Sequence, residues 1–265
     1  MASQRLHKLY EGWTVQICVI HALLIRELTT RFGRENIGFL WIMAEPLLFG
    51  GLVGLLWYYS HGPTEHGMSV IAFVATGYIP ITLFRHCVSR SIAVFTANQS
   101  LLYHRQIKIV DFIVARFIIE FLGGMMAYFF MAVVLIAFDL FPIPNDIGLL
   151  IAGWLLYSLF CFSLCLFIAP LSETSEIMEK FVPVSTYIMI PFSGLAYLVD
   201  WLTPSAREFL LLSPFVNAME MMRKGIWGDL IVAHYNVWNP IICSAPFIVF
   251  GLILCRSVRR KLTVE

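Results

Sequence analysis

The hydrophobic positions of the chain fall into six long apolar stretches that are separated by polar segments. A helix needs roughly 20 mostly apolar residues to cross the hydrocarbon core of a bilayer, and each stretch is close to that length. The stretches are Ile37–Tyr59, Met68–Phe84, Phe117–Phe138, Ile147–Pro170, Phe181–Val199 and Val237–Cys255. The pattern therefore predicts an all-α integral membrane protein with six transmembrane helices.

Two of these stretches depart from a regular span. Met68–Phe84 is short, and we expect its helix to continue past Arg85. Phe181–Val199 contains Pro183 and Pro191, and each proline removes a backbone hydrogen-bond donor from a helix. We therefore expect the fifth span to be kinked or broken, with neighbouring helices satisfying the freed backbone groups.

The segment Trp13–Arg31 is too short and too charged to cross the membrane, but its polarity follows a helical period. Its apolar positions, at helical spacing, are Trp13, Ile17, Ile20, Leu24 and Leu28, and its opposed polar positions are Gln16, Arg26, Thr29 and Thr30. This pattern predicts an amphipathic helix that lies in the cytoplasmic membrane interface.

Two later segments are neither spans nor simple loops. Thr96–Phe112 is basic but carries interleaved apolar residues. Trp201–Asn236 holds two short apolar stretches around Ser213-Pro214, and neither is long enough to span. A pair of half-helices that dips into the outer leaflet fits the second segment, so we expect a re-entrant region before the last span.

Composition agrees with a membrane protein. Hydrophobic residues make up 59% of the chain and charged residues 13%, against about 25% charged residues in soluble domains, and the mean hydropathy is +0.80. The net charge of +1 excludes a globally basic nucleic-acid-binding protein. The six cysteines mostly lie within or beside apolar runs, which favours buried thiols over a metal or redox pair.

The distribution of basic residues predicts the orientation. Loops on the cytoplasmic side of a membrane protein carry an excess of lysine and arginine. With the N-terminus inside, all but three of the 18 lysines and arginines fall on the cytoplasmic side, and the exceptions are Arg207, Arg223 and Lys224. We therefore expect both termini in the cytoplasm.

Motifs for catalysis are missing from the sequence. It contains no G-x-x-x-x-G-K-[ST] phosphate loop, no H-E-x-x-H and no G-x-S-x-G. We find no credible catalytic residues and no metal site, and the polar segments are too short to house a catalytic domain. We therefore expect no enzyme activity in this chain by itself and no cofactor.

Transport against a gradient would need either ion coupling or a separate energy-supplying subunit. Ion coupling favours internal repeats and several ionisable residues at mid-membrane. The two halves show no repeat, Glu45 alone lies inside a span, and Arg116 and Glu120 lie near the inner end of another. These features favour an external motor.

Several motifs resemble one transporter family. Arg31-Phe32 followed by Gly38-x-x-Trp41-x-x-x-x-Pro46 is similar to the entry of the first span in ABC-2 type permeases of the polysaccharide-export branch. Ser213-Pro214-Phe215, with Glu220 and Arg223 before Gly225-Ile226-Trp227-Gly228, resembles the re-entrant region of that family. The run from Asn217 to Arg223 looks most like capsular-polysaccharide export permeases of Gram-negative bacteria.

The resemblance implies the activity and the partners. It implies a homodimer of six-span subunits in the bacterial inner membrane, with two copies of a separate nucleotide-binding ATPase that binds ATP and Mg. The substrate would be a long, usually anionic, lipid-linked glycan, passed to a periplasmic adaptor and an outer-membrane exporter. The implied domains are a cytoplasmic N-terminal segment at 1–35, a transmembrane domain at 36–256 and a basic tail at 257–265. Within the transmembrane domain, a coupling loop occupies about 96–112 and the re-entrant segment about 201–236.

Candidate substrate-path residues lie on the first span. Trp41, Glu45 and Phe49 share a helix face, where Trp41 would stack on sugar rings and Glu45 would accept hydrogen bonds from hydroxyls. Alternatively, Glu45 braces the break at Pro46 and bonds a neighbouring helix. The aromatic residues Trp57, Tyr58 and Tyr59 end the span, either as a membrane-interface belt or as part of an exit path.

Candidate ATPase-coupling residues lie in a short helix expected over Leu101–Asp111. The apolar residues would sit in a groove of the ATPase and the charged ones would pair with it, although an ordinary positive-inside loop would also explain the charges. The set is Leu102, Tyr103, Arg105, Ile107, Lys108 and Asp111. The acidic Ser172–Lys180 is expected to be a solvated turn or a second contact with the motor.

Candidate outer-gate residues are Pro214, Phe215, Glu220 and Arg223. Glu220 and Arg223 are three apart on one helix face and are expected to pair. Two other functions stay open for the whole chain. One is an ABC permease for another substrate, such as O-antigen, teichoic acid or a drug, and the other is a membrane scaffold without a conduit.

Overall fold

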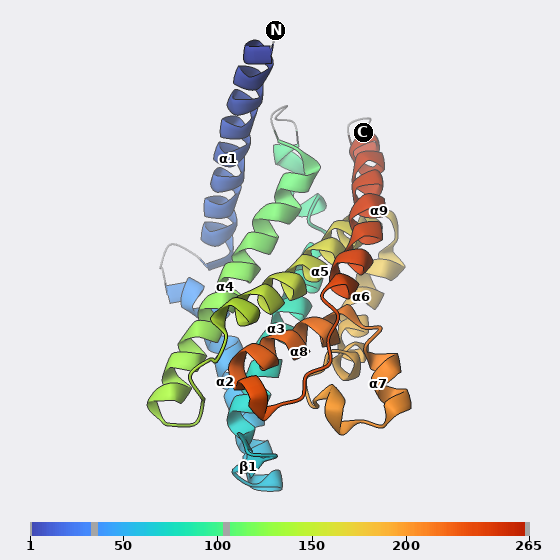
Figure 1. The fold of residues 1–265 in the computed structure, drawn as a ribbon. Coiled ribbons are helices and arrows are strands. Elements are labelled where there is room, and N and C mark those ends of the chain that lie inside the picture. The colour runs from blue at the N-terminus through green and yellow to red at the C-terminus, as the bar shows by residue number, and fades with distance from the viewer. Residues whose placement is uncertain (1, 33–36, 103–106, 263–265) are drawn as a thin grey trace.

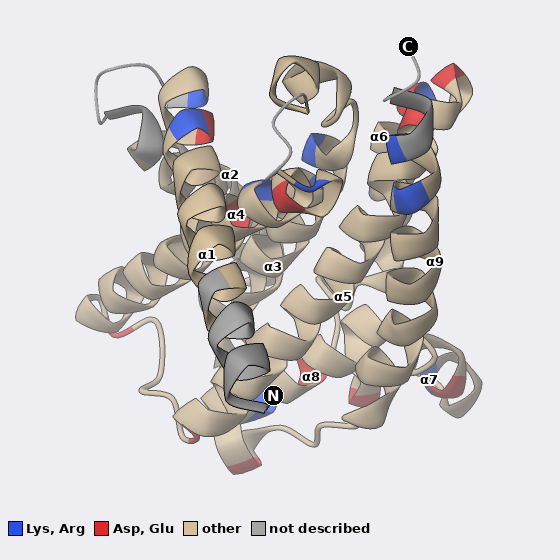
Figure 2. Ribbon diagram, turned by 90° about the horizontal axis from the view of Figure 1, so that it is seen from above, with Lys and Arg blue, Asp and Glu red and all other residues tan. Residues whose placement is uncertain are grey.

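A computed structural model of the chain describes residues 2–32, 37–102 and 107–262. Most of these residues lie in helices that pack as one bundle (Figure 1). The N-terminal end of the first helix and the C-terminal end of the last lie at the same end of the bundle. Figure 2 looks onto this end and shows basic residues near α1, α6 and α9.

The long apolar stretches form long helices. They are α2 (Ile37–His61), α3 (Val70–Ser91), α4 (Ile109–Ala137), α5 (Ile147–Thr174) and α9 (Trp238–Leu262). Among the residues searched, four helices are long and apolar enough to cross a membrane, namely α3, α4, α5 and the Trp238–Arg259 part of α9. The expected continuation past Arg85 is confirmed, because α3 runs on to Ser91.

The fifth predicted span is broken, as its prolines predict. Helix α6 covers only Glu176–Ile188, which is about 20 Å long at 1.5 Å per residue and too short for a hydrocarbon core of about 30 Å. The short 3₁₀ helices η2 (Ile190–Phe192) and η3 (Val199–Trp201) follow it. The chain between them is irregular, so its backbone groups need partners from elsewhere.

The segment before the last span contains two helices on either side of Ser213-Pro214. Helix α7 covers Pro204–Leu210, and α8 covers Pro214–Trp227 with its proline in the first turn, where the missing N–H costs no helical bond. A 3₁₀ turn, η4 (Gly228–Leu230), ends it. The predicted pair of short helices is therefore confirmed.

A two-stranded hairpin lies at the end of the bundle opposite the termini (Figure 1). Strands β1 (Thr64–Glu65) and β2 (Met68–Ser69) pair antiparallel. The two residues between them, His66 and Gly67, both have positive φ angles of 51° and 78°, which is typical of the type I′ turn that favours glycine.

Glycines allow the central helices to approach closely. A Cβ atom at Gly153 would lie 2.8 Å from the backbone nitrogen of Met222, which joins α5 to α8. A Cβ atom at Gly251 would lie 2.6 Å from the carbonyl oxygen of Leu166, which joins α5 to α9. Small residues at such crossings let backbones pack against each other where hydrophobic association is weak.

The structure corrects the helix expected over Leu101–Asp111. A 3₁₀ helix, η1 (Thr96–Leu101), precedes this segment, and Lys108 is extended with φ −100° and ψ 148°. The carboxylate of Asp111 accepts a hydrogen bond from the Lys108 backbone N–H at 2.8 Å. This cap makes Ile109 the first residue of α4, so the described part of the segment is not one helix.

Candidate functional site

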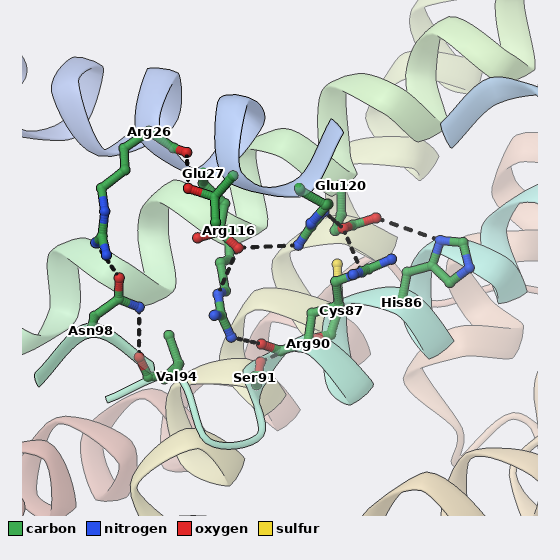
Figure 3. Close-up of polar contacts among 12 residues, drawn as sticks. Arg26, Glu27, His86, Cys87, Arg90, Ser91, Val94, Asn98, Arg116 and Glu120 are labelled. Atoms are coloured by element: carbon green, nitrogen blue, oxygen red, sulfur yellow. Dashed lines mark hydrogen bonds and ion pairs between the residues drawn. The ribbon is translucent and has the colours of Figure 1, made fainter. Parts of the chain in front are cut away.

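Charged side chains gather where the C-terminal part of the first helix, α1 (Ala2–Phe32), crosses α4. Each helix contributes an acid and a base four residues apart, and these pair crosswise. Glu27 lies 3.0 Å from Nε of Arg116, and Arg31 Nη1 lies 2.5 Å from Glu120 Oε1. Figure 3 shows Glu27, Arg116 and Glu120 lined up between the two helices. We call these four residues the reciprocal clamp.

Glu120 is the centre of a larger network. Its side chain is 3% exposed, and it also lies 3.2 Å from Nε of Arg90 and 3.5 Å from Nδ1 of His86, both on α3. One carboxylate thus receives groups from α1 and α3 (Figure 3). A buried carboxylate is stable only when it is paired and hydrogen-bonded in this way.

The network borders a cavity of about 460 Å³. Four arginines and Glu27 line it, and two of these arginines, Arg31 and Arg90, pair with Glu120. The four arginines carry four positive charges, and Glu27 and Glu120 carry two negative charges, so two positive charges are in excess. The arginines are Arg26, Arg31, Arg90 and Arg116. The cavity is therefore suited to a negatively charged group.

Helix α1 contacts the bundle through polar side chains as well as through the buried Leu23. Gln16 donates a hydrogen bond to the Asp111 carboxylate, and Arg26 donates to the Asn98 side chain at 2.6 Å (Figure 3).

Of the predicted apolar positions of α1, Trp13 and Ile17 are 69% and 60% exposed, whereas Leu24 is half-buried and packs against the core. The predicted helix forms and begins earlier, at Ala2, but its apolar positions are divided between exposed and half-buried surroundings.

Glu45 contacts a neighbouring helix. Its Oε1 lies 3.3 Å from Nε2 of His86, whose other ring nitrogen faces Glu120. Glu45 therefore links α2 to the charged network, which favours the bracing interpretation of this residue. The two aromatic residues that share its face, Trp41 and Phe49, are 62% and 54% exposed on the outer surface of α2.

The aromatic residues at the far end of α2 interact locally. Trp57 stacks on the His61 ring with centroids 5.2 Å apart, and Tyr58 meets Tyr59 edge to face at 5.7 Å. Tyr59 is 84% exposed. The structure therefore does not bring these three residues together with Trp41 or Glu45.

The predicted coupling residues have different surroundings. Leu102 and Ile107 are half-buried, Lys108 is exposed and Asp111 is buried as the cap of α4. The remaining two, Tyr103 and Arg105, lie outside the described residues.

The acidic segment near this loop has a structural role. Glu173 accepts hydrogen bonds from the backbone N–H groups of Phe95 and Thr96 at 3.2 and 3.1 Å, and from the Thr96 hydroxyl at 2.7 Å. It thereby holds the loop in place against the end of α5.

Glu220 and Arg223 are buried on α8, but within the described residues no ion pair joins them. Glu220 accepts hydrogen bonds from the backbone N–H groups of Val199 and His234 at 3.1 and 3.2 Å. Burial raises the pKa of Glu220 above its usual value, and burial lowers the pKa of Arg223 to about 10. The expected pairing is replaced by separate backbone contacts.

Arg223 instead satisfies the irregular chain after α6. Its guanidinium donates to the carbonyl oxygens of Gly194, Tyr197 and Leu195 at 2.7, 2.6 and 2.7 Å. It also lies 3.9 Å above the ring of Phe73. Pro214 begins the same helix, and Phe215 packs among the rings of Phe84, Tyr157 and Phe160.

Sequence reasoning missed His86 and the reciprocal clamp. The available signal was the pair of spacings Glu27-x-x-x-Arg31 and Arg116-x-x-x-Glu120, which place opposite charges on one helix face. In the structure the two helices cross, so that these residues pair between helices. Neither spacing alone predicts this crossing.

Known proteins share the sequence over nearly its full length. A model of the ABC-2 type transporter family matches residues 19–227. The chain is 35% identical over 251 residues to the capsule polysaccharide export inner-membrane protein CtrC of Neisseria meningitidis, covering 94% of this chain and 95% of the relative. It is 31% identical over 247 residues to the capsule polysaccharide export inner-membrane protein BexB of Haemophilus influenzae, covering 93% of each. It is also 31% identical over 250 residues to the polysialic acid transport protein KpsM of Escherichia coli, covering 93% of this chain and 95% of the relative.

Proposed function

The chain belongs to the ABC-2 type transporter family, and we propose that it is the membrane-spanning permease subunit of an ATP-driven polysaccharide exporter. The observation that carries this proposal is the similarity, over more than nine-tenths of the chain, to proteins named for capsule polysaccharide export and polysialic acid transport. The substrate that we propose is a capsular glycan, anionic and linked to a lipid.

The arginine-lined cavity supports an anionic cargo. Its excess positive charge lies where α1 packs against α4, and the exposed Trp13 and Ile17 of α1 suit the membrane interface. An anionic head group arriving from the inner leaflet would meet this cavity first. The phosphate and carboxylate geometries that arginine binds bidentately fit such a head group.

ATP hydrolysis is assigned to a separate subunit. We propose two copies of a nucleotide-binding ATPase that hold ATP and Mg, docked below a homodimer of this chain, so that the chain itself has no enzyme activity or cofactor. Docking would involve the loop from Thr96 to Asp111, where the exposed Lys108 and the half-buried Leu102 and Ile107 are the described candidates. Tyr103 and Arg105 complete the proposed set.

The proposed topology has six spans in the bacterial inner membrane and both termini in the cytoplasm. The N-terminal end of α1 and the C-terminal end of α9 lie at the same end of the bundle, which supports placing both termini on one side of the membrane (Figure 1). The short α6 would be the incomplete fifth span, and α7 and α8 would form a re-entrant segment on the periplasmic side. An adaptor and an outer-membrane exporter would receive the glycan there.

The proposed path follows α2 at the subunit interface. Trp41 and Phe49 would provide ring surfaces for sugars, while Glu45 would brace the helix through His86. Trp57, Tyr58 and Tyr59 would lie at the exit, and the Pro214–Arg223 part of α8 would form the outer gate. Substitution of Trp41 by alanine should reduce glycan export. Export at the wild-type rate would remove Trp41 from the path.

Copurification separates this function from the alternatives. A permease should copurify with an ATPase whose activity depends on this chain, whereas a scaffold should not stimulate hydrolysis. Alanine substitutions at Leu102, Arg105 and Lys108 should weaken both the association and export. If all three variants retain both, the proposed coupling surface is wrong.

A further inference from the structure

A second cavity lies among α2, α3 and α4 and is almost entirely apolar. Its volume is about 230 Å³. Ile71, Ala75 and Ile79 form its α3 wall at a spacing of four residues. The α2 wall consists of Pro46, Leu47, Gly50 and Gly51, and the α4 wall of Phe130, Met131, Val134 and Leu135. We call this cavity the acyl cleft.

Neighbouring glycines on α2 produce the cleft. Gly50 and Gly54 lie against α3, where a Cβ atom would be 3.1 Å from the ring of Tyr78 and 3.5 Å from Ile71 respectively. A Cβ atom at Gly51 would meet nothing within 4 Å. Gly50 and Gly54 thus allow α2 and α3 to pack closely, and Gly51 leaves an opening beside this contact.

The surroundings of the cleft identify its occupant. Helices α3 and α4 are apolar and long enough to cross a membrane. Next to the α4 wall residues in the sequence, Phe129 and Val133 are 71% and 49% exposed. The exposed apolar side of α4 therefore suits contact with the hydrocarbon of the membrane. Water would find almost no polar partner inside, and an engineered apolar cavity of about 150 Å³ stays dry and binds benzene.

We propose that the acyl cleft binds part of one acyl chain of a membrane lipid. The α3 wall from Ile71 to Ile79 is about 12 Å long at 1.5 Å per residue, so an extended chain lying along it contacts all three helices. This inference goes beyond the proposed function, because binding would occur whether or not the protein exports a glycan. The proposed occupant is bulk phospholipid, because the described residues that line the cleft hold no polar side chain that would select a head group.

Photocrosslinking of the full chain in nanodiscs tests the proposal. The probe is phosphatidylcholine with a diazirine on its acyl chain, and labelled residues are identified by mass spectrometry. Met131, which is 6% exposed, and Ile79, which is 1% exposed, should be labelled in the wild type. G51F should reduce their labelling about fivefold, because a ring at Gly51 stands at the mouth of the cleft. The control L52F places the same ring on the neighbouring exposed position and should leave labelling unchanged.

A graded series keeps the test informative if G51F folds poorly. G51A and G51V should reduce labelling of Met131 and Ile79 progressively. Absence of labelling at these residues in the wild type, or equal labelling in G51V and the wild type, would overturn the proposal. The same photoreactive chain on phosphatidylglycerol tests whether the head group matters. Equal labelling by both lipids supports bulk phospholipid as the occupant, and preferential labelling by phosphatidylglycerol would overturn this assignment.

Discussion

Arg223 shows how one side chain can replace regular secondary structure. The chain between η2 and η3 has no helix or strand to satisfy its carbonyl groups, and irregular backbone at membrane depth is tolerated only where protein buries it. Three of these carbonyl oxygens accept hydrogen bonds from this one guanidinium. The sequence placed Arg223 beside Glu220, but its actual partners lie 26 to 29 residues away, and no local spacing could predict them.

Removal of this guanidinium should therefore be costly. R223M leaves three buried carbonyl groups without donors and should lower the free energy of unfolding by about 3 kcal/mol. R223K should recover only part of this, because an ammonium group lacks the planar fork. Thermal unfolding in detergent measures both variants, with R256M at an exposed position of α9 as the matched control. Equal stability of R223M and the control would contradict this role.

Glu120 has a similar role at the other end of the bundle. E120A leaves Arg31, Arg90 and His86 without their shared carboxylate and should destabilise the protein by about 3 kcal/mol. E208A removes an exposed glutamate of α7 and should change stability by less than about 0.5 kcal/mol. The measurement is again the unfolding temperature in detergent. A similar value for both variants would show that the network around Glu120 adds little stability.

At the scale of the elements, hydrophobic periodicity predicted the helices well and their ends less well. The broken fifth span followed from Pro191, whereas Pro183 is accommodated inside α6, and the helix break before α8 followed from Pro214. The beginning of α4 did not follow from the sequence pattern. It depends on Asp111, whose side chain accepts a hydrogen bond from the backbone N–H of Lys108. The first residues of this helix look like part of a basic loop. The length of α1 was also missed, since its first turns lack the regular apolar spacing.

The reciprocal clamp predicts a rescue by charge exchange. E27R places two arginines together and R116E places two glutamates together, so each should loosen α1 from α4. The double variant E27R–R116E restores one opposite-charge pair and should recover about 1 kcal/mol relative to the sum of the single effects. A double-mutant cycle of unfolding temperatures measures this coupling. Strictly additive effects would show that Glu27 and Arg116 do not interact.

Close helix packing predicts a size limit at Gly251. Valine there would place side-chain atoms against the carbonyl oxygen of Leu166 and should cost about 1–3 kcal/mol through overpacking. G12A is the matched control, because a Cβ atom at Gly12 meets nothing within 4 Å and alanine is the better helix former. The control should be neutral or slightly stabilising. Unfolding temperatures that rank G251V at or above the wild type would contradict the packing of α5 against α9.

At the scale of the whole molecule, the positions of the charged residues bear on the proposed transport function. The positive-inside pattern and the family motifs were readable from the sequence, since they depend on local composition. The arginine-lined cavity was not, because Arg26, Arg31, Arg90 and Arg116 come from three separate segments that only the fold brings together. The cavity therefore extends the sequence-based account, since it provides a polar binding surface beside an otherwise apolar bundle.

Reconstituted transport measures whether this chain and an ATPase together move a glycan across a membrane. Proteoliposomes would contain this chain and its partner ATPase, and the movement of a fluorescent lipid-linked capsular glycan across the bilayer would be followed by protection from an added glycosidase. We expect movement that requires ATP and both subunits and that is slowed by the charge-removing substitutions R90Q and R26Q in the cavity. Movement without the ATPase, or none with both subunits and ATP present, would contradict the assignment as an ATP-driven polysaccharide permease.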